Sequence, residues 1–355
     1  MKSITYFIIA LFLFSIGCKK DGDPDITPPP PTGRFNPTPY FLNLPAHFSL
    51  IGAPDIPKDN PLTEEGVALG RMLYYEQKLS KGGPMEGKSC SSCHHQNSSF
   101  SIPDAIPNFN NVMPHFNLAW TKQFLWEGGV SGTLEDIMMF EVRDFFKADL
   151  SQIRTDAEYK KRFKAAFNVD TIKEREVTYA LAQFMRTMIS GNSRFDNFIK
   201  IFFSDEEVIG PTLTNQERRG LDWFMAEGKG DCFHCHGDLT NPLLTDNAFK
   251  NNGLDINPDS GLAKTTKNPW DIGKFKTPSL RNLVFTAPYM HDGRYTTLEE
   301  VVDFYADNVK ESSPNIDGTM LKTRELTSSE RADLVAFLKA ITDSSYTTNL
   351  AFSRP

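Results

Sequence analysis

Apolar residues recur at helical spacing through much of the chain. Residues 62–76 place four apolar side chains roughly on one face of a helix. Residues 214–228 and 327–341 each begin with a threonine followed three positions later by a glutamate, which is the spacing of a capping box. Alternating strand patterns are scarce, so we predict a mainly α protein with long irregular loops. The apolar faces comprise Val67, Leu69, Met72 and Leu73 in the first segment and Leu334, Phe337, Leu338 and Ile341 in the last.

The first 18 residues have the pattern of an export signal. Lys2 supplies a positive charge, and Ile4–Ile16 form an apolar stretch that is too short for a spanning helix. One interpretation is an ordinary secretory signal with an incidental cysteine. We favour a lipoprotein signal, because Cys18 follows the small Gly17 at the place where such signals are cut and acylated, although Ser15 stands where leucine is usual.

Residues 19–45 are rich in proline and polar residues, and they predict an extended tether without a core. An acylated Cys18 and this tether predict a protein anchored to a membrane of the cell envelope by lipid. The lysine after Cys18 favours the outer membrane, and we expect the protein to face the periplasm. No later segment has the pattern of a transmembrane helix.

Composition bears on size and partners. The 355 residues are enough for one large or two medium domains, and 39% of them are hydrophobic, which is sufficient for a sizeable core. The formal net charge is −7, and lysine and arginine occur only in short pairs. Nucleic-acid binding therefore has little support.

Two further cysteine pairs are each followed at once by histidine. In c-type cytochromes two thioethers hold the edge of a haem, and the next histidine binds its iron. A structural zinc site would require the distant pairs to meet, and a disulfide within each pair is a second alternative. Two copies in an exported chain favour two covalently bound haem c groups, with His95 and His234 at a haem edge or in a loop. The motifs are Cys90, Cys93 and His94, and Cys232, Cys235 and His236.

The two halves of the chain resemble each other in the order of several features. In each half an asparagine lies nine positions before the residue that precedes an acidic-Gly pair, and a Thr-Leu-Glu-acidic segment follows. The ordered set predicts duplication of a haem domain, with a boundary near residue 205. We expect domains at 46–205 and 206–345 and a tail at 346–355. The matching positions are Asn117, Trp126 and 133–136, and Asn282, His291 and 297–300.

These motifs and their surroundings resemble the dihaem bacterial cytochrome c peroxidase family, including its MauG-like enzymes, from about residue 61 to 341. The matching stretches include "VALGRMLYYEQKLS", "FLWEGG", "ISGNSRFD" and "FKTPSLRNLVFTAPYMHDGRYTTLEEVVDFY". The resemblance implies that H₂O₂ reacts at the N-terminal haem and that the C-terminal haem relays electrons. It also implies that Trp126 lies between the haems and couples them, whereas Trp120, Trp223 and Trp270 are expected to be ordinary core aromatics.

The resemblance also implies a Ca²⁺ ion between the haems. Its protein ligands map to Asn111 and to the backbone carbonyls of Thr286 and Pro288, and oxygen ligands suit this hard cation. Without the resemblance these positions would be interpreted as turn residues.

The sixth ligand of the C-terminal haem separates branches of the family. Tyr305 stands where peroxidases that need reductive activation place methionine, which resembles the His–Tyr haem of MauG. A phenolate stabilises ferric iron, whereas methionine favours the reduced state. Met290 is a rival ligand, a buried helix aromatic is the alternative for Tyr305, and His291 is expected to be a neighbouring relay residue.

The other face of the N-terminal haem is expected to be open. Activatable family members carry a histidine in the loop after the first haem motif, but Pro103 holds that place here. His115 and Met113 are the nearest substitutes. An open iron accepts H₂O₂ without prior reduction.

The acid/base residue of the family is not matched at its usual position. Ungapped counting puts Lys147 where peroxidases have a glutamate that moves the proton during O–O cleavage. Glu141 and Asp144 are the candidate replacements, and Gly129 replaces an arginine that usually follows the bridging tryptophan.

The sequence is therefore compatible with three functions. The first is a peroxidase that reduces H₂O₂ to water with electrons from a small cytochrome or cupredoxin. The second is MauG-like oxidation of a partner protein through the same haem–Trp–haem path, and the third is a dihaem electron-transfer cytochrome without chemistry of its own. A homodimer is compatible with the sequence.

Overall fold

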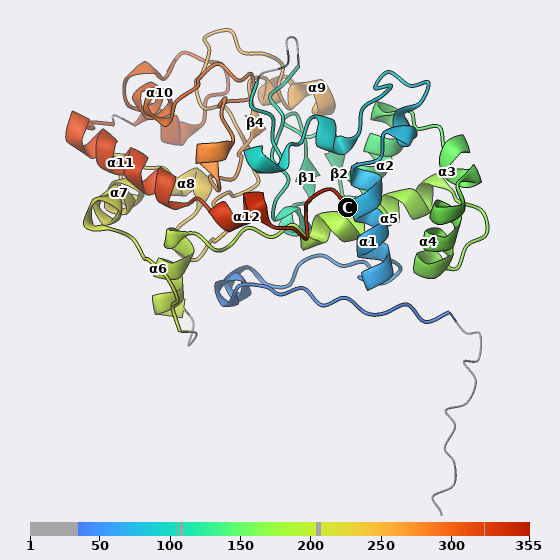
Figure 1. Ribbon diagram of the computed structural model, residues 1–355. Helices are drawn as coiled ribbons and strands as arrows, with labels where there is room; N and C mark the ends of the chain where they lie inside the picture. Colours follow the sequence, from blue (N-terminus) through green and yellow to red (C-terminus); the bar gives the residue numbers. More distant parts are fainter. Residues whose placement is uncertain (1–34, 105, 107–108, 204–206, 323) are drawn as a thin grey trace, which may run out of the picture. The chain divides into compact units, whose positions relative to one another are not determined.

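The computed structural model describes residues 35–355 except 105, 107–108, 204–206 and 323. The predicted signal, Cys18 and most of the tether lie outside these residues. The described part is mainly helical with long irregular connections, as predicted (Figure 1). Within it, no helix combines the length and apolarity needed to cross a membrane.

The regular elements are short. The α-helices are α1 (Glu64–Tyr74), α2 (Leu134–Phe140), α3 (Ser151–Thr155), α4 (Ala157–Phe167), α5 (Glu174–Thr187), α6 (Arg194–Phe203), α7 (Asn215–Met225), α8 (Phe233–His236), α9 (Ala263–Thr266), α10 (Leu298–Asp303), α11 (Ser328–Ala340) and α12 (Ser344–Thr348). Two antiparallel pairs join β1 (Gln123–Phe124) to β2 (Val130–Ser131) and β3 (Phe249–Lys250) to β4 (Phe275–Lys276).

The three predicted helices are present. The side chain of Thr63 caps α1 by accepting the N–H of Gly66. Both predicted capping boxes form, one at the start of α7 and the other at the start of α11. Helix α7 ends at Met225, three residues before the expected glycine, because the backbone turns to an extended conformation at Ala226.

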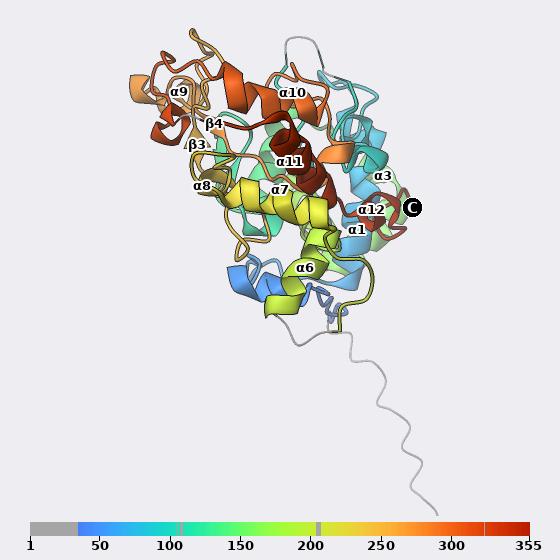
Figure 2. The ribbon, with the colours of Figure 1, turned by 90° about the vertical axis from the view of Figure 1, so that its left-hand side faces the viewer.

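Two apolar clusters form the core. The first is built around α1, α2, α4 and α5, and the second around α6, α7, α10 and α11. Helix α1 packs on α5 in the first cluster, and α7 packs on α11 in the second, where the two lie side by side (Figure 2). Tyr346 and Phe352 belong to the first cluster, so the segment expected to be a plain tail packs against the N-terminal half.

Each of these helix pairs is brought close by a glycine. A Cβ atom on Gly70 of α1 would lie 1.9 Å from the carbonyl oxygen of Ala180 in α5. A Cβ atom on Gly220 of α7 would lie 2.0 Å from the carbonyl oxygen of Asp333 in α11. The two halves thus repeat one packing device, since a residue with a side chain cannot approach a neighbouring backbone so closely.

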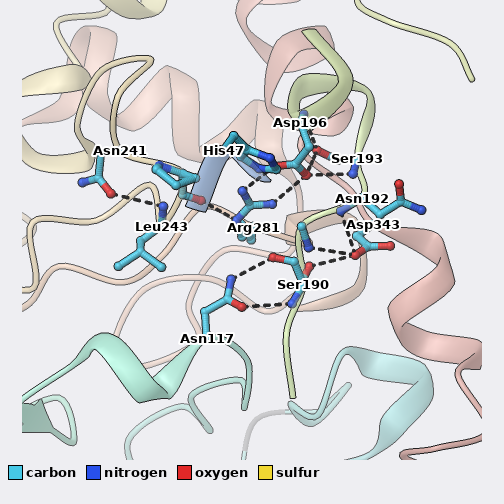
Figure 3. Close-up of polar contacts among 12 residues, drawn as sticks. His47, Asn117, Ser190, Asn192, Ser193, Asp196, Asn241, Leu243, Arg281 and Asp343 are labelled. Atoms are coloured by element: carbon cyan, nitrogen blue, oxygen red, sulfur yellow. Dashed lines mark hydrogen bonds and ion pairs between the residues drawn. The ribbon is translucent and has the colours of Figure 1, made fainter. Parts of the chain in front are cut away.

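Buried polar groups connect the segments between the two clusters (Figure 3). Asp196 accepts hydrogen bonds from both terminal guanidinium nitrogens of Arg281, at 2.6 and 2.9 Å, and lies 2.7 Å from His47 Nε2. Asn117 exchanges two hydrogen bonds with Ser190, whose hydroxyl also accepts the amide of Asn282. The asparagines that matched in the sequence therefore converge on one linker residue, and both have left-handed backbone at φ 55 and 61.

One aromatic prediction is wrong. Trp270 was expected in the core, but it is 74% exposed. It follows Pro269 in a short 3-10 turn, which is capped by the Asn268 side chain and projects the indole outwards. Trp120 and Trp223 are partly buried.

Candidate haem sites

The two Cys-x-x-Cys-His motifs share one hydrogen-bond pattern, although Cys90–Ser92 forms a 3-10 turn and the second motif forms α8. In the first, the N–H groups of Cys93 and His94 both bond to the carbonyl of Cys90, at 3.2 and 2.9 Å. In the second, Cys235 and His236 bond to the carbonyl of Cys232 at 3.2 and 3.0 Å. All four thiols are free, so neither pair forms the alternative disulfide.

Both motif histidines are fixed by a backbone carbonyl. His94 Nδ1 lies 2.8 Å from the carbonyl oxygen of Phe100, and His236 Nδ1 lies 3.2 Å from that of Leu244. Because a carbonyl only accepts, Nδ1 carries the proton and Nε2 keeps its lone pair for a metal. Burial lowers the pKa of each imidazole to about 4, which keeps both rings in the neutral form that binds iron.

The surroundings of the thiols bear on the dithiol and zinc alternatives. Burial and then the charge of Glu141 raise the pKa of Cys90 to about 12, and burial raises that of Cys232 to about 12. A reactive dithiol requires a thiolate, which this environment disfavours. Within the described ranges, no group of three or more His, Cys, Asp or Glu side chains is arranged to hold a metal ion.

The second motif opens on a mostly apolar cavity of about 190 Å³. Cys232, Cys235 and His236 all line it. These residues place two thiols and one imidazole in the wall of the cavity, and most of the remaining wall is apolar. A flat apolar macrocycle suits such a surface, so the residues fit a covalently bound haem. The apolar wall includes Leu280, Leu298, Val302, Leu334 and Leu338.

Both rival sixth ligands line this same cavity. Tyr305 and Met290 contact one residue, Asn252, whose amide lies 3.1 Å from the tyrosine hydroxyl and 3.8 Å from the methionine sulfur. Burial raises the pKa of Tyr305 to about 12, and the Asn252 hydrogen bond opposes that shift. Asn252 therefore favours the phenolate form; nothing in its sequence context indicated this role.

Trp126 connects the two halves. It lines the second cavity together with His291, although it belongs to the N-terminal half. Its indole Nε1 donates to the carbonyl of Asn111 at 2.7 Å, and its own carbonyl accepts the N–H of Lys276 at 2.9 Å. The N–H of Asn111 donates in turn to the carbonyl of His291 at 2.7 Å. The ring of His291 stacks on Phe275, with ring centroids 3.6 Å apart.

The Asn111 side chain lies among backbone carbonyls. Its amide group contacts the carbonyl oxygens of Pro288 and, at 3.3 Å, Met290, while its own Oδ1 is buried without a hydrogen-bond partner. Because the two ends of an amide are assigned from their contacts, turning the group would direct three oxygens to one point, which suits a hard cation. Thr286 is buried nearby in sequence, but Met290 supplies the second carbonyl at Asn111.

His115 and Met113 do not take the place of a ligand opposite His94. The His115 ring stacks face to face on His94, with centroids 3.5 Å apart and planes 19° apart. Opposite ligands point at each other across an iron, so a stacked ring lies beside His94 instead. Met113 lines a separate cavity of about 60 Å³.

The acid/base candidates have different surroundings. Burial raises the pKa of Glu141 to about 7, and its charge raises the pKa of both thiols of the first motif. Asp144 is exposed and bonds to its neighbour Arg143 at 2.8 Å, and Lys147 is exposed in the following loop. Glu141 is thus the one of the three that the fold brings to the first motif.

The comparisons with known proteins agree with this geometry. The family model described as "Di-haem cytochrome c peroxidase" matches residues 64–201. The methylamine utilization protein MauG of Methylorubrum extorquens is 34% identical over 302 residues, which cover 80% of each chain. The cytochrome-c peroxidase IdrP1 of Pseudomonas sp. strain SCT is 30% identical, with 84% of this chain and 87% of that protein covered.

A solved structure extends the similarity to the fold. The crystal structure of a MauG-like protein associated with microbial copper homeostasis has a TM-score of 0.77 and 31% identity, and the match covers 89% of this chain and 99% of that one. The family resemblance in the sequence is thereby confirmed, as are the helical fold and the expectation of an oxidoreductase. The chain belongs to the di-haem cytochrome c peroxidase family, whose members include the MauG proteins and carry two haem c groups.

Proposed function

We propose that this protein reduces H₂O₂ to water at its N-terminal haem, with electrons delivered one at a time through the C-terminal haem. The balanced reaction consumes two electrons and two protons for each H₂O₂ and releases two water molecules. The position of Glu141 carries the proposal, because it supplies an acid/base group beside the first haem motif although the usual glutamate position is held by Lys147.

The residues of the first site have separate roles in binding the haem and in moving a proton. Cys90, Cys93 and His94 would hold the first haem, which supplies the redox chemistry when bound. Glu141 takes a proton from one oxygen of H₂O₂ and returns it to the other as the O–O bond breaks, so that one oxygen leaves as water. A carboxyl whose pKa lies near 7 suits both steps, because it exchanges a proton readily near neutral pH.

Electrons enter at the second site in this proposal. Cys232, Cys235 and His236 would hold the second haem, and Tyr305 would be a further ligand, because it lines the same cavity and its hydroxyl accepts a hydrogen bond from Asn252. Trp126 couples the two sites, a role supported by its place in the wall of the second cavity and by its hydrogen bond to Asn111. The donor is a small cytochrome or cupredoxin.

A second function is favoured by the Tyr305–Asn252 pair. A phenolate ligand stabilises oxidised iron, which suits withdrawal of electrons from the side chains of a partner protein. The similarity to MauG proteins supports the same alternative. In this case the path through Trp126 carries electrons in the same direction, but the reductant is a partner protein that becomes modified.

We also propose a bound Ca²⁺ ion at Asn111, between the two halves. The carbonyls of Pro288 and Met290 would supply two of its ligands, and Thr286 stays a further candidate. Chelation followed by calorimetric titration with Ca²⁺ should give one site per chain in the protein, and no site in an Asn111→Leu variant. Equal Ca²⁺ binding by both proteins would contradict this assignment.

We further propose that Cys18 carries a lipid that holds the protein at the outer membrane, facing the periplasm. The apolar stretch before it and the proline-rich tether after it support this placement. Radiolabelled palmitate should be incorporated into the full-length protein and not into a Cys18→Ala variant. Equal labelling of the two would contradict lipidation at this residue.

Steady-state H₂O₂ consumption tests the main proposal. The haem-loaded protein, supplied with a reduced small cytochrome, should oxidise two cytochrome molecules for each H₂O₂ and turn over well above free haem. Turnover no better than free haem would exclude the peroxidase. Mass spectrometry of a candidate partner then separates side-chain oxidation, which predicts added oxygen or cross-links, from electron transfer alone, which predicts an unmodified partner.

A further inference from the structure

The two haem motifs share a hydrogen-bonding unit around their histidines. The carbonyl of Phe100 accepts from His94 Nδ1 and, at 3.3 Å, from the backbone N–H of His115. The carbonyl of Leu244 accepts in the same way from His236 Nδ1 and, at 3.2 Å, from the N–H of Leu280. In each half, one backbone carbonyl thus accepts hydrogen bonds from the motif histidine and from the N–H of a second residue.

His115 and Leu280 are equivalent by position as well. Each lies two residues before an asparagine with left-handed backbone, Asn117 or Asn282, which begins a short 3-10 helix. The two units therefore place different side chains next to otherwise matching histidines. Leu280 contributes an apolar wall to the second cavity, whereas His115 places an imidazole face to face with His94.

Two buried tyrosines hold His115, one through its ring and the other through its backbone carbonyl. The hydroxyl of Tyr74 in α1 lies 3.1 Å from His115 Nδ1, and the hydroxyl of Tyr346 in α12 donates to the His115 carbonyl. Both tyrosines are at most 2% exposed. Tyr346 therefore restrains the backbone of His115, and Tyr74 restrains its ring through the hydroxyl contact and an edge-to-face ring contact.

We propose that His115 is a positioning residue for His94, which sets the orientation of this ligand and the polarity around it at the first haem only. The proposal rests on the proposed function in one respect, namely that His94 binds a haem iron. The stacked ring limits rotation of His94 about its axis. Its polar edge favours the more highly charged ferric state, an effect that the apolar Leu280 does not provide at the second site.

The experiment exchanges the two side chains in the full haem-loaded chain. His115→Leu should raise the reduction potential of the first haem and make its ferric electron paramagnetic resonance signal broader and more rhombic, with the second haem unchanged. Leu280→His is the matched variant, and it should lower the potential of the second haem alone. Tyr74→Phe removes one hydroxyl and should shift the first haem in the same direction as His115→Leu, by less.

An unchanged first-haem potential and signal in His115→Leu would overturn the proposal. Equal shifts of both haems would also overturn it, because they would reflect general loosening of the structure. If His115→Leu does not fold, Tyr74→Phe decides by the same two readouts. Absorbance of the pyridine adducts counts the haems bound by the parent protein. Fewer than two haems per chain would contradict the proposed function. Two haems per chain with no shift in His115→Leu would contradict only the role of His115.

Discussion

Glu141 and Tyr305 occupy the same place in the two halves of the chain. Each lies eight residues after the threonine that caps its helix, Thr133 for α2 and Thr297 for α10. In both halves the α-helix continues into a π-helical turn, at Glu141–Phe145 and Phe304–Asn308. Each residue is also electrostatically coupled to the two thiols of its own haem motif. The duplicated position therefore carries a prospective iron ligand in one half and a proton-transfer group in the other.

Replacing Glu141 tests the proton-transfer group. Glu141→Gln keeps the size of the side chain and removes its ability to accept a proton, so kcat/KM for H₂O₂ should fall by about 10²–10⁴-fold. Stopped-flow measurement of the reaction of the haem-loaded protein with H₂O₂ gives this value. Asp144→Asn is the control, because Asp144 is exposed and paired with Arg143, and it should react like the parent. A Glu141→Gln rate equal to that of the control would remove Glu141 from the mechanism.

The same residue predicts the pH dependence. Burial raises the pKa of Glu141 to about 7, and only the ionised carboxylate can accept the proton of H₂O₂. The value of kcat/KM should therefore rise with pH up to about 7 and level off above it. Glu141→Gln should lack this rise. A parent profile that stays flat from about pH 5 to 8 would contradict the assignment.

Trp126 is expected to control electron transfer between the haems. Trp126→Phe keeps an aromatic ring and removes the Nε1 hydrogen bond to Asn111, so transfer from the second haem to the first should slow while the ferric spectra of both haems persist. Rapid mixing of the reduced protein with H₂O₂ follows the oxidation of the second haem directly. Trp223→Phe is the matched control on α7. Similar rates for the two variants would exclude Trp126 as the coupling residue.

The close packing at Gly70 predicts the effect of a substitution on the free energy of unfolding, independently of the haem sites. Gly70→Ala forces a methyl group against the carbonyl of Ala180, so the free energy of unfolding should fall by about 1–3 kcal/mol. Gly318→Ala places its methyl group in open space and serves as the control. Urea titration followed by circular dichroism measures both. Equal stability of the two variants would contradict the close approach of α1 to α5 at Gly70.

The sequence predicts the local features well because short-range chemistry determines them. Capping boxes specified the starts of α7 and α11, and the two Cys-x-x-Cys-His motifs predicted two equivalent sites, each with a histidine held by a backbone carbonyl. Position alone was less informative. Ungapped counting chose Lys147 for the catalytic place, but this residue lies in an exposed loop, and the π-helical turn before it cannot be recognised from apolar spacing.

Contacts between distant segments account for the rest. The hydrogen bonds from Asn252 to Tyr305 and from Trp126 to Asn111 join residues 53 and 15 positions apart, and no pattern within either segment indicates them. The exposure of a single tryptophan likewise depends on distant segments. The sequence predicts Trp270 in the core, whereas the structure places it at the surface. The stacking of His115 on His94 depends on Tyr74 and Tyr346, which come from opposite ends of the described chain.

In the proposed function one haem iron is open to H₂O₂ and the other is closed by a protein ligand. Electron paramagnetic resonance of the purified ferric protein distinguishes these two states of iron. The proposed sites predict one high-spin haem with His94 as its only protein ligand and one low-spin haem with His236 and a sixth ligand, each integrating to one spin per chain. Two low-spin signals that integrate to two haems per chain would contradict this account, because neither iron could then bind H₂O₂.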